Sequence, residues 1–399
     1  MPVIQTAIVY LPDRESLHGA GLKVAGLTVL ERLLFTATRA GVREIYLPTR
    51  LTDVLPPERL NQRGRLGHAV RWLSDRASDE AARLRESAVL LLPAHTVVDP
   101  GSLERLGRAT ANSYVISLEE TKGSTAPILR IPPGLTSKLW RRLVHGELIG
   151  EELEAALRRE NARLVTGGGY AVAVTDPNSA RQAGAKLYQS LGTSADGWVD
   201  RILNRRCSRL FTHLLVYLPV TPNQISVLSL ALGVAGAYGF WNASLASALV
   251  GALFYELAVI LDHTDGEIAR LKFLESPLGK WLDFSIDTVT HGALVLGMAV
   301  TASRSSGLWG MGLGILAAAG IVMSAVVART GNASGESHGP VGHLLRRMAN
   351  RDLFYLVVIA SLIGLWGLPS LLPWLVGVLA IGSHGYWLTS VIYRAWGGR

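Results

Sequence analysis

The sequence is poor in cysteine and lacks several patterns that would define its class. Cys207 is the only cysteine among the 399 residues, which excludes an intrachain disulfide and a cysteine-based zinc site. The N-terminal segment has no basic stretch followed by an apolar core, so no cleavable signal peptide is expected. No basic stripe interleaved with aromatic residues is present, so nucleic acid is not an expected partner despite the formal net charge of +8.

Apolar residues are abundant and unevenly distributed. They make up 49% of the chain, and the mean hydropathy is +0.28. The length suits two folded units. Residues 1–200 have the composition of an ordinary soluble domain, whereas long apolar runs dominate from about residue 209 onward. The sequence therefore predicts a water-exposed domain followed by a membrane domain.

The first half alternates β-rich and helical segments. Strand-like runs and helical periodicity lead to expected strands at 3–10, 43–47, 89–92 and 170–174, and helices at 24–40 and 102–108. Three glycines at 167–169 mark a tight turn before the last of these strands. Such alternation is typical of an α/β domain with a mainly parallel sheet, which we expect over residues 1–195.

Six apolar stretches follow, each close to the roughly 20 residues that a helix needs to cross a bilayer. We expect an all-α bundle of six transmembrane helices within residues 221–399. The expected spans are 222–242, 243–263, 277–302, 306–329, 352–369 and 370–393. Arginines are concentrated before the first span, in the loop at 329–351 and after the last span. By the positive-inside rule, both termini of this multi-pass protein are expected in the cytoplasm, at the cytoplasmic (inner) membrane.

Residues 196–220 form an expected juxtamembrane helix. Arg201, Arg205 and Arg209 recur every four residues and would share one helical face just before the membrane. This face is either a simple positive-inside anchor or an interfacial helix that lies on anionic headgroups and couples the two domains. The two interpretations are compatible.

The segment 261–287 carries the chemistry. Asp262 and Asp265 are three residues apart, and Asp283 and Asp287 are four apart, so each pair would lie on one helix face, with Gly279 on the stripe of the second pair. Carboxylates in membrane segments are costly and usually mark a functional site. Clustered carboxylates call for a positive counter-charge, and Mg²⁺ prefers oxygen ligands. Two such ions would clamp a diphosphate.

Other interpretations of these residues remain open at this point. A small transporter with cation-binding aspartates would explain the carboxylates, but not the residues spaced around them. A membrane-anchored nucleotidyltransferase with a passive anchor is a third possibility. Two nearby histidines are expected to be structural: His291 continues the stripe of Asp287, and His263 falls on a different helix face from Asp262.

The spacing D-x2-D-G-x2-A-R-x8-G-x3-D-x3-D resembles the signature of the CDP-alcohol phosphotransferase (CDP-alcohol phosphatidyltransferase) family. All eight fixed positions are present, and the segment beginning Thr221-Pro222-Asn223 is similar to the start of the first span in that family. The resemblance covers roughly residues 196–393. It implies an enzyme that moves a substituted phosphate from a CDP-alcohol to a hydroxyl acceptor with release of CMP, in phospholipid or inositol-phosphodiester synthesis.

The resemblance also assigns roles by position. The resemblance implies two metal ions, either Mg²⁺ or Mn²⁺, held by Asp262, Asp265, Asp283 and Asp287. Asp287 would also be the catalytic general base. The CDP moiety would contact Asp262, Asp265, Gly266, Ala269, Arg270 and Gly279. A phosphate on the acceptor would be bound by Arg351 or Arg346, and the chain would form a homodimer in the lipid bilayer.

The N-terminal domain resembles sugar-phosphate nucleotidyltransferases. The order of the two domains, with this domain before the membrane domain, is similar to that in the fusion of inositol-phosphate cytidylyltransferase to di-myo-inositol-phosphate-phosphate synthase. The glycine-rich phosphate loop of that family corresponds here to 11–16, which contains no glycine. Lys23 corresponds to the substrate lysine, but the acidic residue expected after the strand at 89–92 is missing, and Asp99 is too far on. We therefore expect a degenerate domain; the alternative is a bifunctional enzyme whose first domain makes the CDP-alcohol from CTP.

Overall fold

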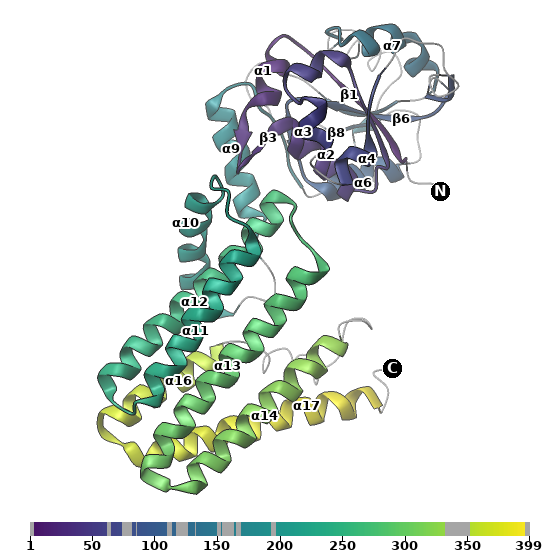
Figure 1. Ribbon diagram of the computed structural model, residues 1–399. Coiled ribbons are helices and arrows are strands. Elements are labelled where there is room, and N and C mark those ends of the chain that lie inside the picture. Colours follow the sequence, from purple (N-terminus) through teal and green to yellow (C-terminus); the bar gives the residue numbers. More distant parts are fainter. Residues whose placement is uncertain are drawn as a thin grey trace. The chain divides into compact units, whose positions relative to one another are not determined.

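The computed structural model divides the chain into two compact units, Met1–Ser190 and Leu191–Arg399, which Figure 1 shows in colours that follow the sequence. The structure describes residues 4–61, 65–73, 82–84, 86–109, 114–116, 127–131, 133–149, 153, 163–164, 169–192, 197–331 and 352–395.

The first unit contains a mixed seven-stranded sheet flanked by helices. The strand order is β10-β8-β9-β6-β1-β4-β5. The strands are β1 (Thr6–Tyr10), β4 (Glu44–Leu47), β5 (Val70–Trp72), β6 (Val89–Pro93), β8 (Tyr114–Ile116), β9 (Ile128–Ile131) and β10 (Arg163–Leu164). The four strands from β6 to β5 are parallel, and β9 runs antiparallel to both of its neighbours. The expected α/β class with a largely parallel sheet is confirmed.

Alternating side chains of β1 divide the apolar core into two layers. Ala7 and Val9 pack in one cluster with α2 (Val29–Arg39), whereas Ile8 and Tyr10 pack in the other with α7 (Pro133–His145). A period of two along a strand sends successive side chains to opposite faces. Both faces of the sheet are therefore covered, which is why β1 and β6 read as continuous apolar runs.

The helix expected at 24–40 begins later than its periodicity suggested. A short hairpin of β2 (Lys23–Val24) and β3 (Leu27–Thr28) precedes α2, and its turn uses the positive φ angles of Ala25 and Gly26. Thr28 and Glu31 then form a reciprocal capping box that fixes the start of α2.

The other elements of this unit are α1 (Glu15–Gly21), η1 (Thr49–Asp53), α3 (Pro57–Asn61), α4 (Arg65–Ala69), β7 (Thr96–Val98), α6 (Pro100–Arg108), β11 (Ala171–Ala173) and α9 (Pro177–Gln189).

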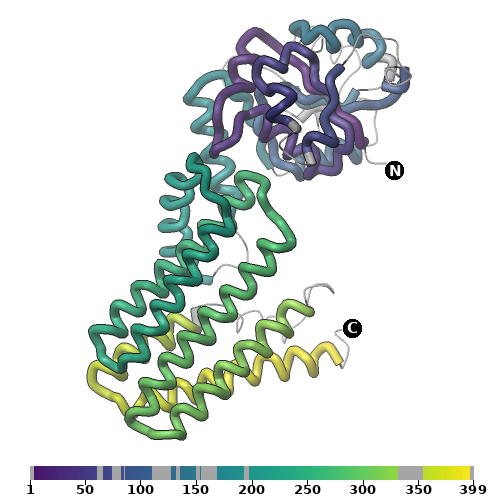
Figure 2. The backbone as a smooth tube through the Cα atoms, viewed as in Figure 1, coloured from purple at the N-terminus to yellow at the C-terminus, as the bar shows by residue number. Residues whose placement is uncertain are grey.

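The second unit is entirely helical in its described part. It begins with η2 (Asp200–Asn204) and α10 (Arg205–Leu215). Six apolar helices follow: α11 (Pro222–Trp241), α12 (Leu245–Lys272), α13 (Pro277–Ser306), α14 (Leu308–Gly331), α16 (Asp352–Gly367) and α17 (Leu372–Ala395), with the short η3 (Pro369–Leu371) between the last two. Figure 2 shows α11, α12 and α13 running alongside one another, with α14 and α17 on the far side of α13.

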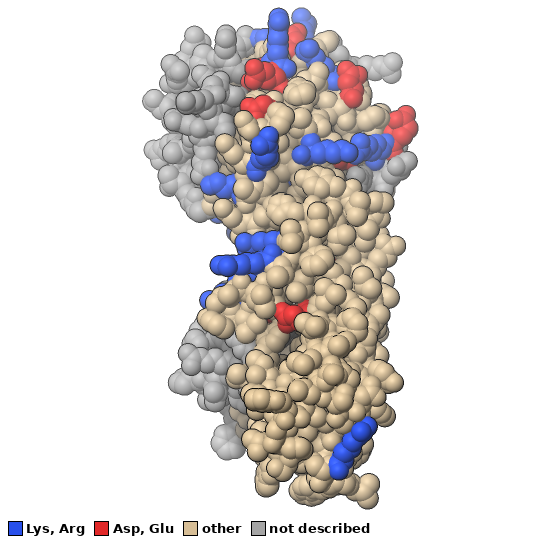
Figure 3. Space-filling view, turned by 90° about the vertical axis from the view of Figure 1, so that its left-hand side faces the viewer, with Lys and Arg blue, Asp and Glu red and all other residues tan. Residues whose placement is uncertain are grey.

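Five of these helices are long and apolar enough to cross a membrane. The stretch expected as the fifth span forms the shorter α16, of 16 residues. A 16-residue helix is about 24 Å long, less than the roughly 30 Å of a typical hydrocarbon core. The expected helical bundle is confirmed, and the described residues contain five candidate spans where six were expected. The face of this unit in Figure 3 is mostly free of charged side chains, as a surface in contact with lipid requires.

Glycines allow α11 and α12 to approach closely. A Cβ added at Gly239 would lie 2.5 Å from the Cα of Gly251, and one added at Gly236 would lie 2.8 Å from the carbonyl oxygen of Gly251. Small residues at such positions let membrane helices pack backbone to backbone. This contact fixes α12, the helix that carries the first pair of aspartates.

One end of the bundle gathers the tight turns and the exposed tryptophans. Ser305 donates to the carbonyl oxygen of Pro369 over 3.4 Å, which joins two of these turns. Trp241, Trp309, Trp366 and Trp374 lie at helix ends there and are 51–79% exposed. Exposed tryptophans are enriched at membrane–water interfaces. Asp262 lies 17 residues along α12 from Leu245, about 26 Å at 1.5 Å per residue, and therefore near the opposite boundary of the bilayer.

The juxtamembrane segment differs from its expected single arginine face. Arg201 is exposed, but Arg205 is buried against α12, where it pairs with Glu267. The residues Asp200–Asn204 form a π-helical turn, which changes the register relative to a regular α-helix. Leu210 and Leu214 of α10 are about two-thirds exposed, at 63% and 64%, so the helix retains an outward apolar face.

Candidate active site

The connection between α12 and α13 brings Asp262 and Asp265 of α12 close to Asp283 of α13. Phe273 ends α12 in the left-handed conformation, with φ of 56°. Ser276 then caps α13, because its side chain accepts a hydrogen bond from the backbone of Gly279, and Pro277 occupies the first helical position. The chain reverses direction here, and α11 packs against both α12 and α13.

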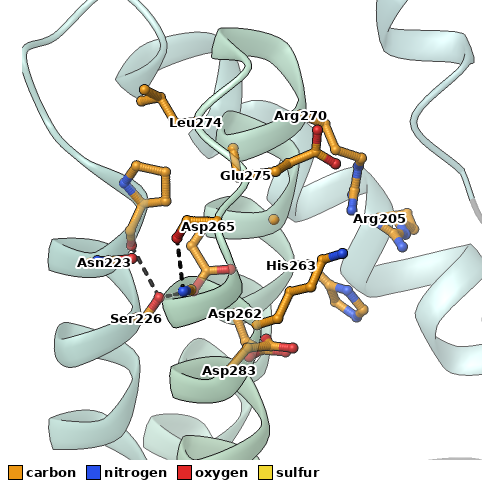
Figure 4. A pocket seen from close by; sticks show the side chains of 16 residues that line it. Arg205, Asn223, Ser226, Asp262, His263, Asp265, Arg270, Leu274, Glu275 and Asp283 are labelled. Carbon is orange, nitrogen blue, oxygen red and sulfur yellow. Dashed lines mark hydrogen bonds between the residues drawn. The ribbon is translucent and has the colours of Figure 1, made fainter. Parts of the chain in front are cut away.

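Three carboxylates converge at this reversal. Asp262, Asp265 and Asp283 each offer an oxygen, and these oxygens lie within 4.8 Å of one another. Asp265 is only 5% exposed and accepts a short hydrogen bond from the hydroxyl of Ser226 on α11, whereas Asp283 is exposed. Figure 4 shows Asp262 and Asp283 close together, with Ser226 and Asn223 on the other side of Asp265. Three helices thus define the position of the cluster.

The cluster opens into a cavity of about 290 Å³. Gly266, Ala269, Arg270 and Gly279 lie in its wall, so seven of the eight signature positions line one space. The eighth, Asp287, is half-buried one turn farther along α13 and belongs neither to the described cavity wall nor to the group of three carboxylates. The glycines have a steric role: a Cβ at Gly279 would stand 3.7 Å from the side-chain oxygen of Asn223 and narrow the cavity.

Positive side chains also line the cavity. Arg270 belongs to the signature, but Lys280 and Arg205 were not singled out as site residues by the sequence. Lys280 directly follows Gly279 at the start of α13, and this position next to a signature residue could have indicated that Lys280 belongs to the site. Arg205 comes from α10, and its guanidinium lies 3.1 Å from the carboxylate of Glu267. An anionic substrate would therefore meet cations on several sides of the acidic cluster.

The two histidines differ in their surroundings. The ring of His291 hydrogen-bonds to the hydroxyl of Tyr255 at 3.1 Å and packs edge-on against Phe354, which favours the packing interpretation. His263 was expected to be structural and does pair with Asp200, over 3.1 Å. However, it also lines the cavity beside Asp262, which its assigned helix face did not suggest.

Arg346 and Arg351, predicted to bind an acceptor phosphate, lie outside the described residues.

The stretch 11–16 of the first unit leads into a helix. Gly19 of α1 packs so closely that a Cβ there would lie 1.8 Å from the carbonyl oxygen of Val174.

His95 follows β6 and is fully buried. Its two ring nitrogens lack hydrogen-bond partners among the described atoms. Burial lowers the pKa of His95 to about 4, an effect that the negative charge of Asp13 partly offsets. Asp99 caps α6 by accepting from the backbone of Ser102 at 2.9 Å, a structural role.

The donor set of the cluster fits a hard divalent cation. Three carboxylates this close repel one another, and the burial of Asp265 increases the cost. Oxygen ligands of this kind are preferred by Mg²⁺ and Mn²⁺, and among the described residues no cysteine or histidine belongs to the group. Fold and site together therefore define a helical membrane domain with an acidic site suited to divalent-metal chemistry on an anionic substrate.

The comparison with known families identifies this domain. The model of the CDP-alcohol phosphatidyltransferase family matches residues 219–381. The chain therefore contains a CDP-alcohol phosphatidyltransferase domain, and its five apolar helices make it a membrane protein. Members of this family act on a CDP-alcohol donor and a hydroxyl acceptor in a membrane setting and generally use a divalent metal.

Curated relatives agree with the family match. A bifunctional IPC transferase and DIPP synthase from Thermococcus kodakarensis is 36% identical over 130 residues, which cover 33% of this chain and 28% of that protein. A protein of the same name from Rubrobacter xylanophilus is 30% identical over 194 residues, 48% of this chain and 40% of that protein. An archaetidylinositol phosphate synthase from Pyrococcus horikoshii is 27% identical over 86 residues, 22% of this chain and 44% of that protein. Each match spans less than half of the relative's length.

Among solved structures, a protein from Bacillus anthracis named for a glucose-1-phosphate thymidylyltransferase activity is similar to part of this chain. The sequence identity is 9% and the TM-score 0.33, over 45% of this chain and 94% of that one. At this TM-score the similarity adds nothing to the α/β assignment, which follows from the sheet topology itself.

Proposed function

We propose that the protein is a metal-dependent CDP-alcohol phosphotransferase that joins a CDP-activated alcohol to a hydroxyl acceptor and releases CMP. The observation that carries this proposal is the convergence of Asp262, Asp265 and Asp283 within 4.8 Å, inside the segment that matches the family. The transporter alternative would leave Gly266, Ala269, Arg270 and Gly279 in the same cavity wall without a purpose.

The residues then have distinct tasks. Asp262, Asp265 and Asp283 would hold divalent ions, Mg²⁺ or Mn²⁺, which would supply positive charge for the diphosphate and for the leaving oxygen. A single ion would leave the three-carboxylate cluster net negative and repel a diphosphate, so two ions suit the site better. Arg270 and Lys280 add positive charge to the cavity wall. Gly266 and Ala269 leave room for the cytidine part of the donor.

Asp287 is proposed as the general base. It takes the proton of the acceptor hydroxyl while the alcohol oxygen forms a bond to the β-phosphorus and the bond from that phosphorus to the CMP oxygen breaks. Its position one turn beyond Asp283 on α13 supports contact with a substrate that lies over the cluster. A contact of Asp287 with the metal ions is proposed as its second role, and it has less support because Asp287 does not belong to the group of three carboxylates.

The setting follows from the membrane domain. We propose the cytoplasmic (inner) membrane, with both termini and the acidic site on the cytoplasmic side, because arginines are concentrated in the sequence before the first span, between the fourth and fifth spans and after the last. A homodimer is proposed from the family resemblance alone. The donor belongs to phospholipid or inositol-phosphodiester synthesis, and Arg346 and Arg351 are proposed to bind a phosphate on the acceptor.

Metal-dependent release of CMP tests the proposal. Full-length protein in detergent is given CDP-diacylglycerol, CDP-inositol or CDP-glycerol with a hydroxyl acceptor, with and without Mg²⁺ or Mn²⁺. We expect CMP only with metal, and a loss of at least about 100-fold for Asp283→Asn or Asp287→Ala, in line with the contribution of a metal ligand or general base. Asp53→Asn, which changes an exposed aspartate of the first unit, is the matched control. Wild-type protein that releases no CMP from any of the three donors would contradict the proposal.

For the first unit, we propose a scaffold that has lost nucleotidyltransferase activity. The helix α1 after β1, in place of a glycine loop, supports this proposal. The alternative, synthesis of the CDP-alcohol from CTP, is suggested by the two activities in the names of the relatives. The Asp283→Asn variant separates them, because a bifunctional enzyme would still consume CTP and accumulate CDP-alcohol when the second step is blocked.

A further inference from the structure

One face of α10 is held against α12. Three polar residues of α10 donate hydrogen bonds to the fully buried carboxylate of Glu267: Arg205, Ser208 and Thr212. They recur at intervals of three and four residues, so they share one side of the helix. Val216, one turn beyond Thr212, is buried and continues this side. The contact with α12 therefore fixes how α10 is turned about its own axis.

The opposite side of α10 is largely apolar and exposed. Leu210, Leu214 and, just beyond the helix, Tyr217 are each at least 60% exposed. Arg206 and His213 are exposed on the same side. We call these five residues the outer face of α10. An exposed apolar patch with polar residues beside it marks a surface that binds a partner protein or a membrane.

The level of α10 along the bundle indicates which partner it meets. Glu267 lies 22 residues along α12 from Leu245, about 33 Å from the end of the bundle that carries the exposed tryptophans. The hydrocarbon core of a bilayer is roughly 30 Å thick, so Glu267 lies at the level of the headgroups. Lys272 donates to the carbonyl oxygen of Leu218 at 2.8 Å, which holds the segment after α10 at the same end of α12.

The direction of α10 also suits a membrane surface. Arg205 and Thr212 are seven residues apart, about 10 Å along α10, and yet both donate to the carboxylate of Glu267. Two helices side by side would pair such residues with different turns of α12, so α10 crosses α12 at an angle, as Figure 1 shows. Because α12 crosses the membrane, α10 is inclined toward the plane of the bilayer surface.

The charge of this segment indicates the kind of lipid. Residues 201–220 contain no aspartate or glutamate, and Arg201 and Arg206 are exposed. Basic residues next to a membrane span are attracted by anionic headgroups, and an amphipathic helix places its apolar side below them. We propose that the outer face of α10 binds the anionic surface of the bilayer, with Leu210 and Leu214 between the lipids and Arg206 against their phosphates. This inference does not depend on the phosphotransferase function.

Depth-dependent fluorescence quenching tests the contact with lipid. The full chain carries Cys207→Ser, which removes its only cysteine, together with Leu214→Cys labelled with an environment-sensitive fluorophore. In lipid nanodiscs, a spin label near the headgroup should quench this fluorophore more strongly than a spin label at the end of the acyl chain. Leu253→Cys is the matched control, because Leu253 is 70% exposed within the membrane-spanning part of α12 and should show the reverse order.

Hydrogen exchange of the unsubstituted protein tests the lipid charge. The backbone amides of 203–218 are compared in nanodiscs of phosphatidylcholine alone and of phosphatidylcholine with phosphatidylglycerol. Exchange should be slower in the anionic nanodiscs by about fivefold for each arginine at the surface, and high salt should reduce the difference. Arg206→Gln should remove about fivefold of it. Arg304→Gln, which changes an exposed arginine at the opposite end of the bundle, should leave the exchange of α10 unchanged.

Each result supports or contradicts the proposal. If neither spin label quenches the fluorophore at position 214, a protein surface covers the outer face and the proposal is wrong. If quenching occurs but exchange is equal in the two kinds of nanodisc, the proposed preference for anionic lipid is wrong. If the labelled variants do not fold, the exchange of the unsubstituted protein decides by itself. Release of CMP is measured separately and tests only the phosphotransferase function.

Discussion

Replacing Glu267 with alanine should strongly destabilise the membrane domain. Its carboxylate is fully buried and accepts hydrogen bonds from Arg205 at 3.1 Å, Ser208 at 3.0 Å and Thr212 at 2.7 Å. All three donors belong to α10, so Glu267 holds this helix against α12. The two hydroxyl groups satisfy lone pairs of the carboxylate that the ion pair with Arg205 leaves open. A buried ion pair is tolerated under this condition.

The magnitude follows from what the substitution leaves behind. Arg205 has a side chain only 8% exposed, so Glu267→Ala would remove the carboxylate that pairs with a buried guanidinium. Removing one partner of such a pair costs about 3–5 kcal/mol. For a unit of this size, each kcal/mol corresponds to roughly 2–4 °C, so we expect the melting temperature to fall by about 6–20 °C. Glu267→Gln keeps the shape and one acceptor oxygen and should lose less.

Thermal unfolding of the purified protein in detergent provides the measurement. The double variant Arg205→Met with Glu267→Leu removes both charges and should be more stable than Glu267→Ala, because no unpaired charge remains. If the losses of the single variants Arg205→Met and Glu267→Leu add up to the loss of the double variant, the two residues are not coupled. A Glu267→Ala protein that melts with the wild type would refute the reasoning about burial itself.

Two further predictions concern packing and pH. Gly239→Ala would set a Cβ 2.5 Å from the Cα of Gly251 and should lower the free energy of unfolding, measured by thermal unfolding, by about 1–3 kcal/mol. The control Gly292→Ala adds a Cβ with nothing within 4 Å and should be neutral or stabilising. Equal losses for the two variants would contradict the close-approach argument. Because the pKa of His95 is lowered to about 4 from 6.5, its contribution to stability is complete above pH 6.5 and is lost as the pH falls toward 4, by about 3 kcal/mol. Hydrogen exchange of the β1 and β6 peptides, corrected for intrinsic rates, should show this loss in wild-type protein and not in His95→Leu.

The parts of the fold that were predicted well depend on local pattern. Long apolar runs specify the membrane helices because a bilayer requires about 20 such residues, and their bounds follow from caps that the sequence contains, such as Ser276 and Pro277 before α13. The start of α2 was misjudged for a related reason. Apolar residues of the β2–β3 hairpin continue the helical period, and only the turn at Ala25 and Gly26 breaks it.

Long-range electrostatic pairing was not accessible to the same reasoning. The four-residue spacing of Arg201, Arg205 and Arg209 predicts one exposed basic face, and such a face satisfies every local rule. The structure removes Arg205 from it, because a carboxylate 62 residues away compensates the cost of burial. A helical wheel contains no information about that partner.

The same limit explains why His263 was assigned a structural role. Its angular position on α12 separates it from Asp262, and a flat site would indeed exclude it. The cavity, however, is not a flat face: Arg205 of α10 and Asn223 of α11 belong to its wall as well, so it extends around α12 and includes neighbouring residues that point in different directions. A residue next to a signature aspartate can therefore line the cavity when a preceding helix packs against that side of α12. The hydrogen bond between His263 and Asp200 indicates that η2 packs there.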